Sequence, residues 1–252
     1  MHIIISPAKL LNISQQEIKN NITQPLFIKE AEKLVELLKT YSVNDISRLM
    51  GINQDLAELN VKRYLEFSSN NTISKPAVIT FNGPVFQKLN AKEFSEKEFR
   101  TTQNRLSILS GLYGILRPLD LIKPYRLEMG TKLKIENFKN LYDFWGDKIT
   151  DFLNTRLEDN NMKTLINLAS NEYFRSINVK KLKARVININ FKELKNGQYK
   201  TLVIYTKQAR GLMANFIIKN NLTNPEDLKH FDIEGYGYDE NLSTENTWVF
   251  TR

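Results

Sequence analysis

The chain opens with MHIIISPAK (residues 1–9), in which three consecutive isoleucines are followed by Ser6 and Pro7. A short apolar run that ends at a proline is typical of a buried strand, because proline cannot donate a ladder hydrogen bond. Ser6 and Lys9 then lie in the loop directly after this strand, and such loops line ligand crevices in open α/β sheets. An exposed surface lysine is an equally good interpretation of Lys9.

Helical and strand patterns follow one another along the rest of the chain without a regular βαβ rhythm. Apolar spacing predicts helices over residues 28–39, 45–50, 56–65, 95–109, 137–157 and 207–220, with Asn44 and Ser95 as N-caps. Strands are predicted over residues 77–81, 164–169, 185–191, 199–206 and 247–251, with a hairpin turn at Asn196-Gly197. These elements indicate an α+β or irregular α/β fold, a single domain over residues 1–252 in which helices surround a mixed sheet.

The composition excludes several kinds of chemistry. The 252 residues contain no cysteine and two histidines, His2 and His230. Disulfides, thiolate nucleophiles, iron–sulfur clusters and cysteine zinc sites are therefore excluded. Any metal site would be rich in oxygen ligands. We expect no cofactor and no resident metal.

Targeting signals are also missing from the sequence pattern. The first nine residues lack the basic start of a signal peptide, and no apolar run approaches the length of a membrane span. We therefore expect a cytoplasmic protein without a membrane partner.

Positive charge is concentrated in residues 175–210. The whole chain has a formal net charge of +8, whereas this segment contains ten bases and a single acid, Glu193. The bases are Arg175, Lys180, Lys181, Lys183, Arg185, Lys192, Lys195, Lys200, Lys207 and Arg210. A basic surface attracts polyanions, above all nucleic acid, so we expect Lys180, Lys181 and Lys183 to contact phosphates.

The segment LSGLYGILRPLDLIKPYRLEMG (residues 109–130) is apolar and also interrupted by glycine and proline. This composition predicts an ordered, packed loop, and functional groups concentrate in such loops. Its bases Arg117, Lys123 and Arg126 are candidates for binding an anion. The alternative is a structural crossover in which the bases pair with neighbouring acids.

The segment KQARG (residues 207–211) is predicted to begin a helix. Lys207 and Arg210 are three residues apart and would share a face beside the small Gly211 and Ala214. Free amides, two cations and small side chains together would form a phosphate site. A solvated helix face is the alternative.

Residues 45–65 form two predicted helices around Gly51, with Arg48, Lys62 and Arg63 nearby. This pattern is similar to a helix-hairpin-helix, whose turn amides bind DNA phosphates. A helix pair that only packs against the core is the alternative.

Five acids are candidates for a metal or acid–base site: Glu128, Asp143, Asp147, Glu172 and Asp239. Asp143 and Asp147 are spaced i, i+4 and would share one face of the predicted helix. Acids that are solvated or paired with bases are the alternative.

Seven segments carry a resemblance to a known family. They are ISPAKLL (5–11), FNGPVF (81–86), the segment 109–130, LYDFWGD (141–147), INLASNEYF (166–174), KQARGLMANFII (207–218) and EGYGYDE (234–240). Over nearly its full length the chain resembles the YaaA family of bacterial peroxide-stress proteins. The resemblance implies an unusual α/β fold and a role in limiting free iron and Fenton damage during hydrogen peroxide stress. It further implies DNA binding through a basic cleft and a helix-hairpin-helix-like element. Mapped onto this chain, the cleft residues would be Lys9, Arg117, Lys123, Arg126, Lys207 and Arg210.

Three functions are compatible with these patterns. The leading hypothesis is a non-enzymatic protein that binds double-stranded or structured DNA, mainly through phosphates. The second is an enzyme acting on a phosphate-bearing or nucleotide-like small molecule in a pocket lined by residues 5–9 and 109–130. In that case Ser6, Lys9, Arg117, Arg126 and Arg210 would hold a small anionic ligand, and Glu128 or Glu172 would transfer protons. The third is an iron-binding protein that uses carboxylates alone.

Overall fold

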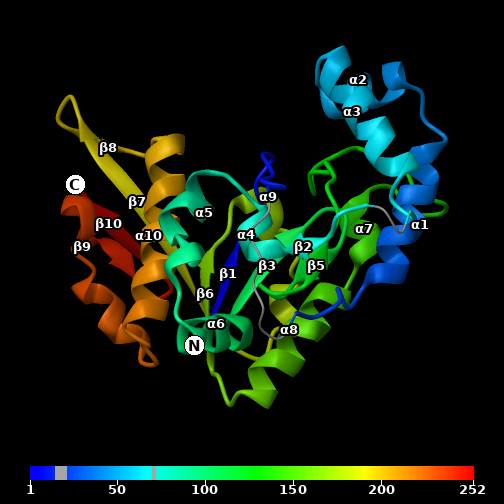
Figure 1. Cartoon of the computed structure of the whole chain (residues 1–252). Coiled ribbons are helices and arrows are strands. Elements are labelled where there is room, and N and C mark those ends of the chain that lie inside the picture. Colours follow the sequence, from blue (N-terminus) through cyan, green and yellow to red (C-terminus); the bar gives the residue numbers. More distant parts are fainter. Residues whose placement is uncertain (15–21, 70–71) are drawn as a thin grey trace.

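The computed structural model describes residues 1–14, 22–69 and 72–252 (Figure 1). In this part of the chain, an eight-stranded mixed sheet has the order β4-β3-β1-β6-β7-β10-β9, and β8 pairs with β7. Its strands are β1 (His2–Ile5), β3 (Leu106–Ser110), β4 (Gly114–Leu116), β6 (Thr164–Leu168), β7 (Arg185–Lys195), β8 (Gln198–Lys200), β9 (Gly237–Thr244) and β10 (Thr247–Thr251). The neighbouring strands β3, β1, β6, β7 and β10 run parallel. A small second sheet pairs β2 (Lys75–Pro76) with β5 (Leu121–Ile122).

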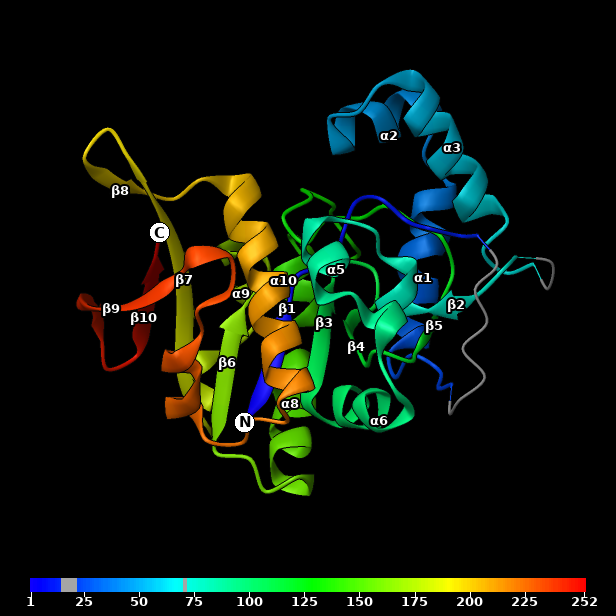
Figure 2. The same cartoon turned by 60° about the vertical axis from the view of Figure 1, so that its left-hand side comes forward.

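Helices cover both faces of the main sheet. They are α1 (Ile28–Lys39), α2 (Val43–Met50), α3 (Gln54–Leu65), α4 (Ala77–Thr80), α5 (Pro84–Leu89), α6 (Glu96–Arg105), α7 (Leu141–Trp145), α8 (Lys148–Asp159), α9 (Asn171–Phe174) and α10 (Val203–Lys219). Short 3-10 turns are η1 (Ala91–Glu93), η2 (Val179–Lys181), η3 (Pro225–His230) and η4 (Ile233–Gly235). Figures 1 and 2 show α5, α6 and α10 on one face of the sheet and α8 on the other. The predicted fold class, helices around a mixed sheet, is confirmed.

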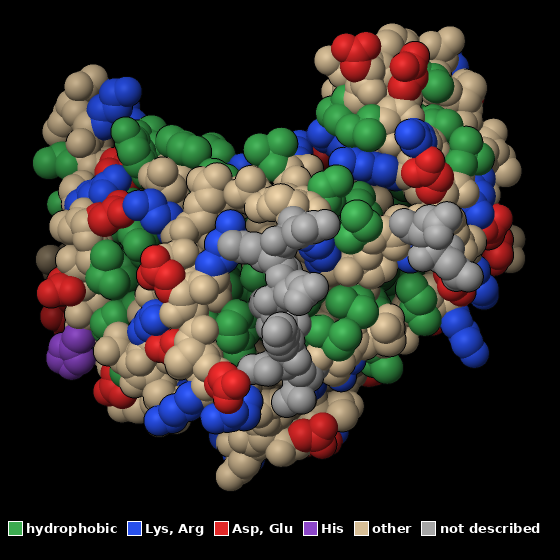
Figure 3. All heavy atoms as spheres, in the orientation of Figure 1, with side chains coloured by type: hydrophobic (Ala, Val, Ile, Leu, Met, Phe, Trp, Pro, Cys, Tyr) green, Lys and Arg blue, Asp and Glu red, His purple; other side chains and the backbone are tan. Residues whose placement is uncertain are grey.

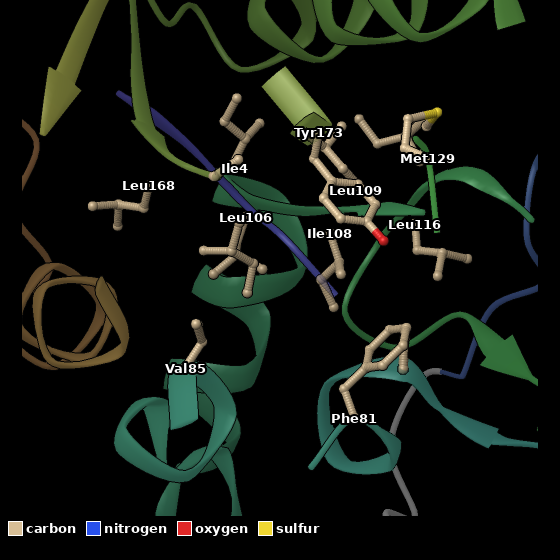
Figure 4. Packing of buried hydrophobic residues seen from close by; sticks show 14 of the residues in the cluster. Ile4, Phe81, Val85, Leu106, Ile108, Leu109, Leu116, Met129, Leu168 and Tyr173 are labelled. Carbon is tan, nitrogen blue, oxygen red and sulfur yellow. The ribbon is translucent and has the colours of Figure 1, made fainter. Parts of the chain in front are cut away.

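The first strand lies in the middle of the sheet. Every residue of β1 is buried, and Ile3 pairs with Leu106 on one side and with Ile166 on the other. A strand with neighbours on both edges and helices on both faces reads as an unbroken apolar run, which explains the three isoleucines. Figure 4 shows Ile4 within this core, together with Leu106, Ile108 and Leu168 from the adjacent strands.

Two parts of the molecule project beyond the sheet and leave a notch between them. On one side α2 and α3 form an arm that rests on α1, and on the other side the β7–β8 hairpin extends away from the core (Figures 1 and 2). The space-filling view shows the surface hollowed between these projections (Figure 3). The carboxyl ends of β1 and β6 point toward this notch.

The helix predicted over residues 95–109 is wrong over its last four residues. The capping box between Ser95 and Glu98 is present, but α6 ends at Arg105 and β3 begins at Leu106. Every residue of β3 is buried between β1 and β4, so this strand has no polar face. An apolar run without alternation does not distinguish a strand from a helix, which accounts for the error.

Two predicted strands differ in the structure: residues 77–80 are helical, and the strand predicted over 199–206 ends at Lys200. Residues 77–80 form the single turn α4, which is closed by the bond from Phe81 N to Ala77 O, and its first-turn amides Ala77 N and Val78 N donate to Asp120 O and Pro118 O. The hairpin turn at Asn196-Gly197 is confirmed, but β8 ends at Lys200 and α10 begins at Val203. Tertiary contacts therefore override strand propensity at both places.

Two helix boundaries also differ from the prediction. The helix predicted over 137–157 is interrupted at Gly146, which has a positive φ of 48° and separates α7 from α8. The second helix is capped by Ser42 instead of Asn44, in a reciprocal capping box with Asp45. The predicted helix over 28–39 and the strands near 164, 185 and 247 are confirmed.

The buried His2 predicts a specific pH dependence of stability. Its Nε2 lies 2.9 Å from Ser107 Oγ, and burial, assisted by Arg156, lowers the pKa of His2 to about 3. An unfolded histidine has a pKa of about 6.5, so below that pH only the unfolded chain takes up the proton. Its contribution to stability is therefore complete above pH 6.5 and is lost as the pH falls toward 3, at about 1.4 kcal/mol per pH unit. Urea unfolding of the wild type and His2→Gln across pH 4–8 measures this difference. Equal slopes in the two proteins would contradict the assignment.

At Gly111 the backbone near the start of the 109–130 segment lies against the backbone near its end, at Leu127. A Cβ at Gly111 would lie 2.2 Å from the Leu127 carbonyl oxygen, and Trp145 Nε1 donates to the Gly111 carbonyl at 3.0 Å. We expect Gly111→Ala to destabilise the protein by about 2–4 kcal/mol, because backbone must move. Gly237→Ala is the control, since a Cβ there meets nothing within 4 Å. Equal denaturation midpoints for the two variants would show that the backbone at Gly111 can move away from Leu127 without cost.

Candidate functional site

A cavity of about 420 Å³ lies at the carboxyl ends of β1 and β6, where they point toward the notch. Open sheets bind ligands at this edge, because the loops that follow neighbouring parallel strands meet there. The lining residues come from the loop after β1, the start of α5, the end of the 109–130 segment, β6 with α9, and α10. They are Ser6, Pro7, Ala8, Lys9, Leu10, Gly83, Pro84, Val85, Phe86, Tyr125, Arg126, Leu127, Glu128, Leu168, Ser170, Glu172, Tyr173, Lys207 and Arg210.

Ser6 and Ser170 join the two strand ends that form the base of the cavity. The Ser170 amide donates to Ser6 Oγ at 2.8 Å, and Ser6 Oγ lies 3.3 Å from Ser170 Oγ. Each hydroxyl can donate and accept, so the pair can also bond to a ligand in the cavity.

An ion-pair cluster forms one side of the cavity. Glu128 Oε1 lies 2.9 Å from Arg126 Nη2 and 3.3 Å from Lys9 Nζ. Arg126 and Glu128 are mostly buried, whereas the Lys9 side chain is 65% exposed. The arm across the notch reaches this cluster, because Tyr64 OH of α3 donates to the Arg126 carbonyl. One carboxylate therefore faces two bases, and the cluster keeps a positive charge.

Arg210 is the cation in the cavity with the least compensation. Burial lowers its pKa, and its Nε is buried without a hydrogen-bond partner among the described residues. No carboxylate of those residues forms an ion pair with it. Taking a charge out of water is costly unless it is paired, so an anionic ligand would relieve this cost.

Close helix packing fixes the position of Arg210. The next residue, Gly211, lets α10 approach α5 so closely that a Cβ there would lie 2.2 Å from the Val85 carbonyl oxygen. Lys207 lines the cavity one turn earlier and is exposed. Because α10 begins at Val203, these two bases lie inside the helix, and the predicted phosphate site of free first-turn amides is wrong. The two side chains remain as neighbours on one helical face.

Glu172 lies on α9 and lacks a cationic partner within the described residues. Its Oε1 accepts a hydrogen bond from the Gly130 amide at 2.9 Å, which ties it to the end of the 109–130 segment. Tyr142 OH donates to the Glu172 carbonyl at 2.9 Å. The second carboxylate oxygen is thus available for a ligand that carries N–H or O–H donors.

Two predicted site residues of the 109–130 segment, Arg117 and Lys123, do not line the cavity. Arg117 Nε donates to Asp120 Oδ1 at 3.0 Å, and Arg117 Nη2 donates to the Gln24 carbonyl at 2.8 Å. Lys123 donates to the carbonyls of Phe67 and Ser69. Both side chains therefore hold parts of the chain together, as expected if the 109–130 segment is a structural crossover. They therefore do not line the cavity with Lys9, Arg126, Lys207 and Arg210, and their contact with a bound anion stays a prediction.

The basic segment 175–210 does not form one patch in space. Lys181 pairs with Asp147, and Lys183 Nζ lies 2.7 Å from Glu158 Oε1 of α8, while Lys180 is exposed in the same η2 turn. These lysines pack against α8, on the face of the sheet opposite to α10. Lys180, Lys181 and Lys183 therefore lie apart from Lys207 and Arg210, and the contact of either group with phosphates stays a prediction.

The arm formed by α2 and α3 turns at Gly51, which has a φ of +60° and caps α2. Arg48 Nη2 pairs with Asp45 Oδ1 at 2.7 Å, and Lys62 lies 3.9 Å from Glu66. Arg63 is half-buried, and its Nη1 donates to Asn60 Oδ1 at 3.3 Å. Two helices around a glycine are present as predicted, and their contact with DNA stays a prediction.

The candidate acids do not assemble into a metal site. In residues 1–14, 22–69 and 72–252, no group of three or more His, Cys, Asp or Glu side chains could hold a metal ion. Asp143 and Asp147 do not share a helix, because Gly146 separates α7 from α8. Among the described residues, no helix is both long and apolar enough to cross a membrane.

Sequence reasoning missed part of the cavity lining. Ser170, Tyr125, Tyr173 and the Gly83-Pro84 start of α5 were not singled out as site residues. The signal that could have found Ser170 and Tyr173 is the apolar strand at 164–168, since residues after two adjacent parallel strands meet at one edge.

Comparison with known proteins identifies the family of this chain. A family model described as peroxide stress protein YaaA matches residues 1–242. A UPF0246 protein of Aliivibrio fischeri strain MJ11 is 47% identical over 254 aligned residues, covering 100% of this chain and 98% of that protein. A UPF0246 protein of Acaryochloris marina is 46% identical, covering 100% of both chains, and one of Clostridium perfringens is 46% identical, covering 99% and 98%. This chain therefore belongs to the YaaA (UPF0246) family of peroxide stress proteins.

Proposed function

We propose that this member of the peroxide-stress family binds DNA in the notch, with phosphates at the cavity bases Lys9, Arg126, Lys207 and Arg210. DNA is the molecule that iron-catalysed peroxide chemistry damages, so occupancy of DNA would connect binding to protection and to limiting free iron.

The half-buried guanidinium of Arg210, whose Nε is buried without a partner among the described residues, is the observation that carries the proposal. Its Nε lacks a hydrogen-bond partner within the described chain, and burial lowers its pKa. A phosphate oxygen is a charge-assisted acceptor that suits a guanidinium. A site that keeps this cation unpaired therefore favours an anionic ligand.

The charge balance of the cavity points the same way. Its lining includes Lys9, Arg126, Lys207 and Arg210 but only two acids, Glu128 and Glu172. Phosphate contacts supply most of the affinity in DNA binding that does not depend on sequence. The surface is hollowed between the α2–α3 arm and the β7–β8 hairpin (Figure 3), and an extended polyanion would lie in this notch.

A second candidate is an enzyme that acts on a phosphate-bearing small molecule. The observation in its favour is the cavity itself, because about 420 Å³ falls within the range of small-molecule sites. Glu128 and Glu172 would then be the groups that transfer protons. Such an enzyme would bind free anions tightly and would show little affinity for duplex DNA.

DNA binding through these bases predicts a steep dependence on salt. About four to six phosphate contacts give a log–log slope of about −4 to −5 for a labelled duplex in fluorescence anisotropy. Combining Lys207→Ala with Arg210→Met should weaken binding at least tenfold and reduce the slope by about 2, since each lost contact contributes about 0.9. The matched control combines Lys181→Ala with Lys183→Ala, which removes the same charge on the α8 face. Equal losses in both double variants would sink the proposed site and leave only non-specific attraction.

The unpaired Arg210 also predicts a stability gain on its removal. Arg210→Met keeps the apolar stem and removes the buried charge, so we expect stabilisation by about 1 kcal/mol, a rise in Tm of about 2–4 °C. Pyrophosphate should raise the Tm of the wild type and leave that of Arg210→Met unchanged. Arg100→Met is the control, because Arg100 is exposed on α6 at the opposite edge of the sheet. A lower Tm for Arg210→Met would mean that the guanidinium already has a stabilising partner.

A further inference from the structure

The cavity is built of two chemically different parts. Pro84 and the mostly buried aromatic residues Phe86, Tyr125 and Tyr173 contribute apolar walls, whereas Lys207 and Arg210 contribute charge from α10. The hydroxyl of Tyr125 lies 2.7 Å from Ser110 Oγ, so it is already bonded within the protein. Burial raises the pKa of Tyr125 and of Tyr173 well above the usual range, and both therefore stay neutral. Such walls suit a planar, uncharged ring, and the α10 bases suit an anion.

Glu172 adds a directional element at the rim. Its Oε1 is held by the Gly130 amide at 2.9 Å, and the described residues provide no base to neutralise it. A carboxylate only accepts hydrogen bonds, so it selects a ligand with N–H or O–H donors, such as the N–H edge of a nucleobase. Inorganic phosphate would pair with Arg210 but would leave Glu172 and the aromatic walls without a partner. A simple phosphorylated sugar offers no planar ring for those walls.

We propose that the cavity binds one nucleotide unit, with the phosphate on Arg210 and Lys207, the base against the aromatic walls, and an N–H edge of the base on Glu172. Guanine fits this edge best, because its N1–H and amino group are adjacent donors. This inference deepens the proposed DNA binding by naming what enters the cavity. A cavity of about 420 Å³ takes a small ligand and not a stacked duplex, so a nucleotide from DNA must leave the stack to enter.

The same chemistry has two sources, a free nucleotide or a base unstacked from DNA. Isothermal calorimetry of the full chain with dGMP, dIMP and pyrophosphate tests the first source, since dIMP lacks the amino group of guanine. A duplex with one 2-aminopurine opposite a mismatch tests the second, because its fluorescence rises when the base unstacks. Anisotropy of the same duplex reports DNA binding independently.

Glu172→Gln is the decisive variant. It keeps an oxygen for the Gly130 amide but replaces the other acceptor by a donor, and Glu172 is exposed, so folding should be unaffected. We expect dGMP to bind the wild type at least tenfold more tightly than dIMP, and Glu172→Gln to lose that preference while its pyrophosphate affinity is unchanged. Arg210→Met should lose dGMP and pyrophosphate together. Glu240→Gln, on exposed β9, is the control for a lost carboxylate.

Each outcome decides between the inference and the proposed function. A fluorescence rise that depends on Glu172 supports the inference with DNA as the source, and dGMP binding without that rise supports it with free nucleotide as the source. Intact anisotropy with neither signal overturns the inference and leaves DNA binding in place. Binding of dGMP without duplex binding supports the nucleotide cavity and overturns the DNA proposal. Equal affinity of Glu172→Gln and wild type for dGMP also overturns the inference.

Discussion

The parallel pairing of β1 between β3 and β6 is the constraint on which the rest of the structure depends. This pairing buries every residue of β1 and brings Ser6 and Ser170 together at one edge of the sheet. Because parallel strands end at the same edge, the loops after β1 and β6 must share a crevice. The closely packed 109–130 segment and the contact of α5 with α10 then close the crevice on its other sides.

The site combines rigid packing with incomplete charge compensation. Gly211 allows α10 to lie against α5, which holds Arg210 in the cavity where its Nε lacks a partner in the described chain. Around it, Glu128 compensates Arg126 and Lys9 only in part, while Glu172 is held by a backbone amide. Proteins commonly keep a destabilising group of this kind where it serves function, because binding of the ligand offsets the cost in folding stability.

Local patterns predicted the elements well where one physical signal dominated. The amphipathic repeat of α1, the capping box at Ser95 and the apolar strand β1 were all read correctly. Errors arose where tertiary contacts decide, as at α4 and at the boundary between α6 and β3. In the site, Ser6, Lys9 and Arg126 were predicted beside the cavity they line, whereas Arg117 and Lys123 were not distinguishable from them. A base that binds a ligand and a base that pairs with Asp120 look alike in one sequence, because only the fold shows which partner is near.

The most direct test of the account is the ¹⁵N–¹H NMR resonance of Arg210 Nε, assigned by comparison with Arg210→Met, during titration with a short duplex. The account predicts a large downfield proton shift and slower exchange with water at saturation, because a buried donor without a protein partner gains a phosphate oxygen. An Arg210 resonance that does not move while the duplex is fully bound would contradict it, since DNA would then lie elsewhere on the protein.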